Sequence, residues 1–133
     1  AFANYDGRGG EPGRDHSYSQ LVRFDDQWRR TQSWTFPASV LERLAPTSTS
    51  GGGFGDDGLI YMTGHDAPEL YVLRLPDAGS MLVHVATFRV PIPGQGWAWD
   101  RTEPRVLYGI NNETREVIAT YVPNLPAEVL KAD

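Results

Sequence analysis

Short apolar runs separated by turn residues dominate the middle of the chain. Between residues 51 and 91 these runs cover residues 52–55, 59–63, 70–75 and 81–90, and Asp, Gly or Pro residues follow each of them. Runs of about 4–8 residues, bounded by such turn residues, are typical of strands in an antiparallel fold. The pattern therefore predicts an all-β protein in which these four runs are consecutive strands of one sheet.

The same order of features starts again after residue 91. A Gly- and Trp-rich run at 94–99 takes the place of the first strand, 106–109 matches 59–62, and 116–123 matches 69–76. Upstream, residues 19–24 and 28–37 resemble the third and fourth strands. The offset of about 43 to 47 residues lies within the range of propeller blades. We therefore expect one all-β domain or fragment over residues 1–133, with units at 1–37, 51–91 and 94–123.

These units resemble the blades of bacterial β-propellers of the NHL, TolB-like and gluconolactonase type, whose second strands read much like the segment DDGLIYMTG. The resemblance covers most of residues 17–123 and implies antiparallel, four-stranded, propeller-like blades. About two and a half blades do not close a ring of four to eight. As partners we therefore expect either further copies of this chain or the missing blades of a longer chain.

Two features lie outside the repeated runs. A short helix is expected near residues 39–45, where Ser39 and Glu42 have the spacing of a capping box and Pro46 ends the pattern. Residues 17–37 predict a hairpin around residues 25–27, in which Trp28 shares a buried face with Trp34 and Phe36.

Composition limits the classes of partner and chemistry. The net charge of −5 argues against nucleic acid and anionic membranes as partners, because both require a basic surface. The absence of cysteine excludes disulfides and thiolate ligands. No apolar run approaches the ~18 residues of a membrane span. The start AFAN would suit the residues after a signal-peptidase cut, so we expect export from a bacterial cytoplasm.

Up-and-down connectivity sorts the loops into two groups at opposite ends of the strands. The longer loops, with His16 and His65, fall at one end, and binding residues concentrate on loops that a rigid scaffold carries. We expect any site at this end. The loops concerned are 7–16, 38–51, 64–68, 91–95 and 111–114.

Two dipeptides in these loops place a carboxylate beside an imidazole. His16, His65 and Asp66 are candidates for general acid–base catalysis, and Asp15 joins them as a candidate ligand of a divalent metal. The alternative is ordinary turn chemistry, since Asp and His cap neighbouring backbone groups. No cofactor is expected under that alternative.

Aromatic and amide side chains offer a second kind of candidate site. Gln95, Trp97 and Trp99 lie where the third unit begins, and Asn111 lies in a loop at the same end. Aromatic rings beside polar groups hold glycans and small molecules by stacking, although packing between sheets uses the same residues.

The predicted function is a non-catalytic, propeller-type binding or assembly module that presents long loops to a small molecule, a glycan or a protein. The alternative is a metal-assisted hydrolase or lactonase with a His/Asp site at the same end. The sequence has no G-x-S-x-G and no H-E-x-x-H motif, so whether the protein is an enzyme stays open.

Overall fold

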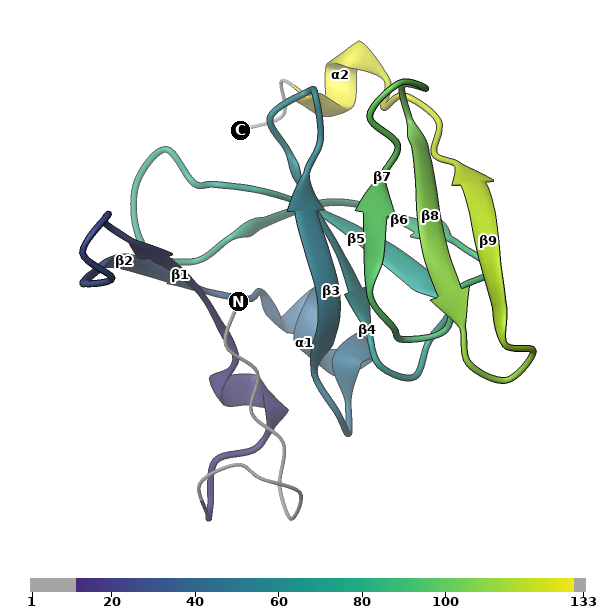
Figure 1. The fold of residues 1–133 in the computed structure, drawn as a ribbon. Coiled ribbons are helices and arrows are strands. Elements are labelled where there is room, and N and C mark those ends of the chain that lie inside the picture. Colours follow the sequence, from purple (N-terminus) through teal and green to yellow (C-terminus); the bar gives the residue numbers. More distant parts are fainter. Residues whose placement is uncertain (1–11, 131–133) are drawn as a thin grey trace.

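The apolar runs of the sequence form strands in the computed structural model, which describes residues 12–130 (Figure 1). Every strand is antiparallel to its neighbour, which confirms the all-β prediction. The first sheet is a hairpin, the second has the order β3-β4-β5-β6, and the third has the order β7-β8-β9. The strands are β1 (Gln20–Phe24), β2 (Arg30–Thr35), β3 (Thr49–Phe54), β4 (Ile60–Gly64), β5 (Glu69–Arg74), β6 (Val83–Arg89), β7 (Trp97–Trp99), β8 (Val106–Asn111) and β9 (Glu116–Tyr121).

Three short helical segments accompany the sheets: η1 (His16–Tyr18), α1 (Ala38–Leu44) and α2 (Ala127–Leu130). Helix α1 confirms the helix expected near residues 39–45, but the predicted capping box is wrong. Pro37 is the N-cap and makes no side-chain cap, while the Ser39 hydroxyl lies 2.9 Å from Nδ1 of His84. The tertiary contact with β6 therefore replaces the local one.

The middle strands of the central sheet, β4 and β5, are buried on both faces, which explains why their sequences are largely apolar without alternation. Side chains alternate across a strand, so Ile60 and Met62 face one way and Tyr61 the other. The hairpin and α1 cover the first face, through Phe36, Val40 and Leu44 among others. The β7–β9 sheet covers the second face. The protein therefore has two hydrophobic cores, one on each side of the central sheet.

The prediction for Trp28 is wrong. It lies in the β1–β2 turn with φ of 59° and 83% exposure, because the turn closes at Asp25, which accepts from the backbone N–H of Arg29. Trp34 is packed against the core and Phe36 is buried, as expected.

Successive connections lie at opposite ends of the strands (Figure 1), but the β4–β5 and β8–β9 loops are no longer than the β3–β4 and β7–β8 turns, so the predicted sorting by loop length is wrong for these hairpins. The β3–β4 and β7–β8 turns lie at the upper end, and the β4–β5 and β8–β9 loops at the lower end. There Gly94 of the β6–β7 loop packs on the backbone of His65, since an added Cβ would lie 1.6 Å from the His65 carbonyl oxygen. The expected loop 7–16 and unit 1–37 begin outside the described residues.

Candidate functional site

The β4–β5 loop brings His65 and Asp66 together. Nδ1 of His65 lies 2.9 Å from Oδ1 of Asp66, and both side chains are about half exposed. The other carboxylate oxygen accepts a short hydrogen bond from the hydroxyl of Thr47, in the connection between α1 and β3. The catalytic role of this pair stays a prediction.

Asp15 and His16 belong to a different local structure. The Asp15 carboxylate accepts from the backbone N–H and the hydroxyl of Ser17, which caps η1. These hydrogen bonds lower the pKa of Asp15. Within residues 12–130 no group of three or more His, Asp or Glu side chains gathers as a metal site. Neither the Asp15–His16 pair nor the His65–Asp66 pair has a third such side chain beside it in the described residues. Their role as metal ligands therefore stays a prediction.

Trp97 and Trp99 lie between two sheets. A Cβ at Gly51 would be 3.0 Å from Trp97, and one at Gly53 would be 3.8 Å from Trp99, so the glycines of β3 make room for the indoles. The ring of Trp99 also meets that of Tyr61 edge-on, with centroids 5.1 Å apart. Through these contacts the two indoles pack the β7–β9 sheet against the central sheet. Their predicted role in ligand binding stays a prediction.

Gln95 and Asn111 lie at the lower end of the sheets. Oδ1 of Asn111 accepts from the backbone N–H groups of Glu113 and Thr114, which shapes the β8–β9 loop. The carbonyl oxygen of Gln95 would lie 3.2 Å from a Cβ at Gly51, so its backbone borders the Trp97 packing. Both residues stay candidates for ligand contacts at this end.

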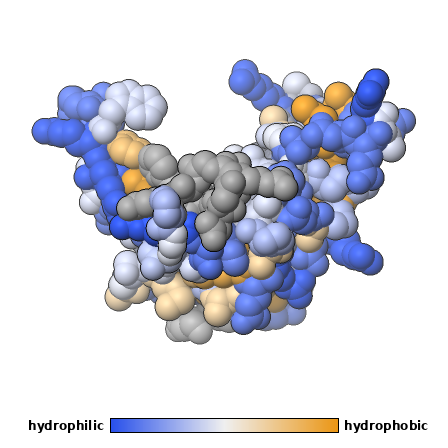
Figure 2. All heavy atoms as spheres, turned by 90° about the horizontal axis from the view of Figure 1, so that it is seen from below, coloured by the Kyte–Doolittle hydropathy of each residue, from blue (hydrophilic) through white to orange (hydrophobic). Residues whose placement is uncertain are grey.

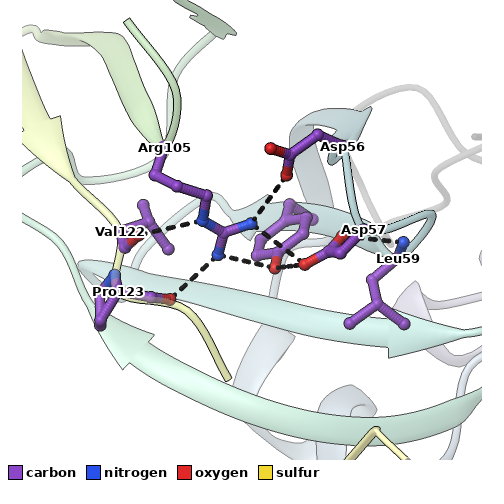
Figure 3. A network of polar contacts seen from close by, with 7 residues as sticks. Asp56, Asp57, Leu59, Arg105, Val122 and Pro123 are labelled. Atoms are coloured by element: carbon purple, nitrogen blue, oxygen red, sulfur yellow. Dashed lines mark hydrogen bonds and ion pairs between the residues drawn. The ribbon is translucent and has the colours of Figure 1, made fainter. Parts of the chain in front are cut away.

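The most developed polar cluster lies at the opposite end, around Arg105 (Figure 3). Its guanidinium reaches across from the β7–β8 turn to the central sheet, where it donates to Asp57 at 3.0 Å and to the Tyr61 hydroxyl at 2.9 Å. It also donates to Asp56 and to the carbonyl oxygens of Val122 and Pro123. These five contacts match the five N–H donors of the group, so the cluster is a closed link between sheets.

Burial and charge in this cluster act against each other. Burial would lower the pKa of Arg105, but the hydrogen bond to Tyr61 and the nearby carboxylates raise it. Burial and the hydrogen bond to Asp57 raise the pKa of Tyr61 to about 12. The hydroxyl of Tyr61 therefore stays protonated and donates to Asp57 at 2.6 Å.

A groove runs between the hairpin and the central sheet. One part of it, of about 390 Å³, has Leu21 and Phe36 on one side and the β3 glycines with Ile60 and Met62 on the other. A second part of about 660 Å³ continues past Phe54 to residues 75–79. Figure 2 shows the two arms that carry the hairpin and the β7–β9 sheet, with a hollow between them.

The β7–β9 sheet exposes an apolar face on the side away from the core. In β8, Leu107 and Gly109 are buried while Tyr108 and Ile110 are exposed. Their register partners Ala119 and Val117 lie on the same face, since directly paired residues do. Ala98, Val106 and Tyr121 complete this surface by register. We call these seven residues, Ala98, Val106, Tyr108, Ile110, Val117, Ala119 and Tyr121, the outer face.

Comparisons with family models, with curated proteins and with solved structures gave no match. None of the described helices has the length and apolar character that crossing a membrane requires. Function therefore has to be argued from the geometry of the described residues.

Sequence reasoning missed both Arg105 and the outer face. Arg105 gives no local signal, because its partner Asp57 lies 48 positions away. The outer face had a signal: residues 106–110 and 117–121 are nearly unbroken apolar runs, as expected of strands that are covered on both faces.

Proposed function

We propose that this chain is a propeller-type binding and assembly module that self-associates through the outer face. The observation that carries the proposal is the exposure of four large apolar side chains side by side on one sheet. Tyr108 and Ile110 are each 45% exposed, Tyr121 is 63% exposed and Val117 71%. No charged side chain lies among them.

The inner face of the same sheet supports this reading. There Leu107 packs against the central sheet and is fully buried. A surface of matching apolar character on the other side is expected to be covered in the working assembly, since contiguous exposed apolar patches mark interaction sites. In addition, β9 ends the sheet and leaves one edge open among the described strands.

The outer side of the hairpin is an unsuitable partner for this surface. Gln20, Ser33 and Thr35 lie there by register around Val22, and Arg30 donates to the side chains of Gln20 and Ser33. Packing the outer face on these polar groups would remove them from water with few new hydrogen bonds. A like-to-like contact between two outer faces avoids that cost.

The size of the face indicates weak association. Two strands of six residues and one of three, at about 3.3 Å per residue and about 4.8 Å apart, make a surface of roughly 240 Å². Stable interfaces bury roughly 800 Å² on each partner. We therefore expect dimers only at high protein concentration, or where several copies add further contacts.

The hydrolase alternative has less support. His65 and Asp66 are paired, but no third ligand stands beside them within the described chain. Catalytic zinc sites use three protein ligands.

Light scattering over a wide range of protein concentration tests the proposal. The chain should show a mass that rises with concentration, and Ile110→Glu should keep it monomeric by placing a charge in the apolar contact. Met81→Glu is the matched control, because Met81 is exposed to 55% outside this sheet. A wild-type chain that stays monomeric throughout, or equal behaviour of the two variants, would contradict the proposal.

A further inference from the structure

The Arg105 cluster shows how the first turns of two neighbouring sheets are joined. Oδ1 of Asp57 accepts from the backbone N–H of Leu59 at 3.0 Å and so fixes its own turn. Oδ2 of the same residue faces Tyr61 and receives the guanidinium of Arg105. One Asp–Tyr pair thus holds its turn and also accepts an arginine from the sheet packed against it.

An Asp and a Tyr also lie near each other at the margin of the outer face, where Asp100 is two residues beyond Ala98. Tyr108 stands opposite Ala98 in register, as Tyr61 stands opposite Gly53. Asp100 follows β7, and its Oδ1 accepts from the backbone N–H groups of Thr102 at 2.6 Å and of Glu103 at 2.8 Å. These backbone hydrogen bonds, with a smaller contribution from the Tyr108 side chain, lower the pKa of Asp100.

The second pair lacks its cation. Among the described residues the Asp100 carboxylate forms no ion pair, and its hydrogen bonds with Thr102 and Glu103 all go to Oδ1. Tyr108 is half exposed, whereas Tyr61 is fully buried. The pair is therefore a ready acceptor for a guanidinium that comes from outside the sheet.

We propose that Arg101 of a second copy supplies this guanidinium, so that Asp100 and Tyr108 of each chain receive Arg101 of the other. This inference rests on the proposed self-association and names the contact that orients it. Arg101 is exposed and lies in the same turn as Arg105. The guanidinium of Arg105 is already bound to Asp57 beside the central sheet, whereas that of Arg101 makes no such contact within the described residues. A two-fold axis parallel to β8 would bring the β7–β8 turns of the two copies together. Asp100 of each copy would then pair with Arg101 of the other, which gives two equivalent ion pairs.

The chemistry suits this role. A guanidinium offers a planar fork of donors to a carboxylate and is more weakly hydrated than an ammonium group, which makes charge-assisted contacts of this kind directional. The rest of the outer face is uncharged and has little to fix its orientation. Charge pairs at the margin of an interface contribute specificity and register.

Sedimentation equilibrium of five chains tests the inference. The wild type is compared with Arg101→Gln, with Asp100→Asn, with the double variant, and with Arg115→Gln. Arg115 is a matched control, because it is an exposed arginine in the turn at the other end of the same sheet. Asp100→Asn keeps an oxygen for the turn, which protects the fold.

Loss of the reciprocal pairs should raise the dissociation constant roughly tenfold in either single variant. The double variant should associate no more weakly than the single ones, because each removes the same contact. Arg115→Gln should stay close to the wild type. Equal effects of Arg101→Gln and Arg115→Gln, or additive effects in the double variant, would overturn the inference. If Ile110→Glu abolishes association while the Arg101 variants do not, the assembly stands and the arginine contact fails; a wild type without association overturns both.

Discussion

The two faces of the β7–β9 sheet are built from the same strands, yet they meet different surroundings. The inner face carries Trp97, Trp99 and Leu107 against the central sheet, and Arg105 closes its upper end. The outer face has an equally apolar composition but stays in contact with water, and its Asp100–Tyr108 pair has no arginine. The inner face is covered by the central sheet, and we propose that a second copy covers the outer face.

This comparison separates two uses of apolar residues in a sheet. On the inner face they stabilise the fold, so substitutions there should lower the free energy of unfolding. On the outer face they contribute little to the fold of a single chain, so substitutions there should change association. The variants below are chosen to separate these two effects.

Removal of Arg105 should have the largest effect. Arg105→Met leaves the part-buried Asp57 carboxylate without its cationic partner and the carbonyl oxygen of Val122 without its guanidinium donor, and breaking such a pair costs about 3–5 kcal/mol. Urea unfolding of this variant checks the loss. Arg105→Lys keeps the charge and should lose less; equal stability of Arg105→Met and the wild type would contradict the account.

Truncation on the two sides of β8 should give different results. Leu107→Ala removes a fully buried side chain and should cost about 2–5 kcal/mol. Ile110→Ala, in the same strand but on the outer face, should cost less than about 1 kcal/mol. Thermal unfolding of both variants measures the two losses of stability. A larger loss for Ile110→Ala would contradict the assignment of the core to the inner face.

The stability of the fold should fall at alkaline pH because of Tyr61. Burial and the Asp57 hydrogen bond raise the pKa of Tyr61 to about 12, whereas a tyrosine in the unfolded chain titrates near pH 10. The stabilisation is complete below about pH 10 and is lost as the pH rises toward 12, by about 2 kcal/mol. Urea titrations between these pH values check the slope, which should become shallower in Tyr61→Phe. An unchanged slope in that variant would contradict this assignment.

Alanine substitutions at two glycines should differ least in their effect on stability. A Cβ at Gly51 would lie 3.0 Å from Trp97 and 3.2 Å from the Gln95 carbonyl oxygen, so Gly51→Ala should cost about 1 kcal/mol. A Cβ at Gly96 would meet nothing within 4 Å, so Gly96→Ala should leave stability unchanged or slightly increased. Differential scanning calorimetry separates the two, and equal losses would mean that β7 packs less closely on β3 than described.

Most of the fold could be predicted from the sequence because its signals are local. Apolar runs such as 59–63 lie between turn residues, and the short helix before Pro46 follows from three apolar positions. The cap of α1 was mispredicted because Ser39 bonds to His84, which is distant in sequence. Trp28 was misplaced because its left-handed φ turns the side chain away from the alternation of the hairpin.

The site was harder to predict, because its contacts join residues far apart in the chain. Loop length and histidines pointed to the lower end, where His65 and Asp66 do pair. The developed cluster lies at the opposite end, and only the packing of the β7–β8 turn on the β3–β4 turn brings Arg105 to Asp57. Neither the resemblance nor the apolar pattern distinguished strands that are covered on both faces from strands with one exposed apolar face.

Hydroxyl-radical footprinting at low and high protein concentration tests the central claim most directly, since it reports the exposure of individual side chains. The account predicts that labelling of Tyr108, Ile110, Val117 and Tyr121 falls as concentration rises. Trp28, exposed to 83% in the β1–β2 turn, should be labelled equally at all concentrations. Labelling of the outer face that stays constant at every concentration, or protection that appears on the hairpin instead, would contradict it.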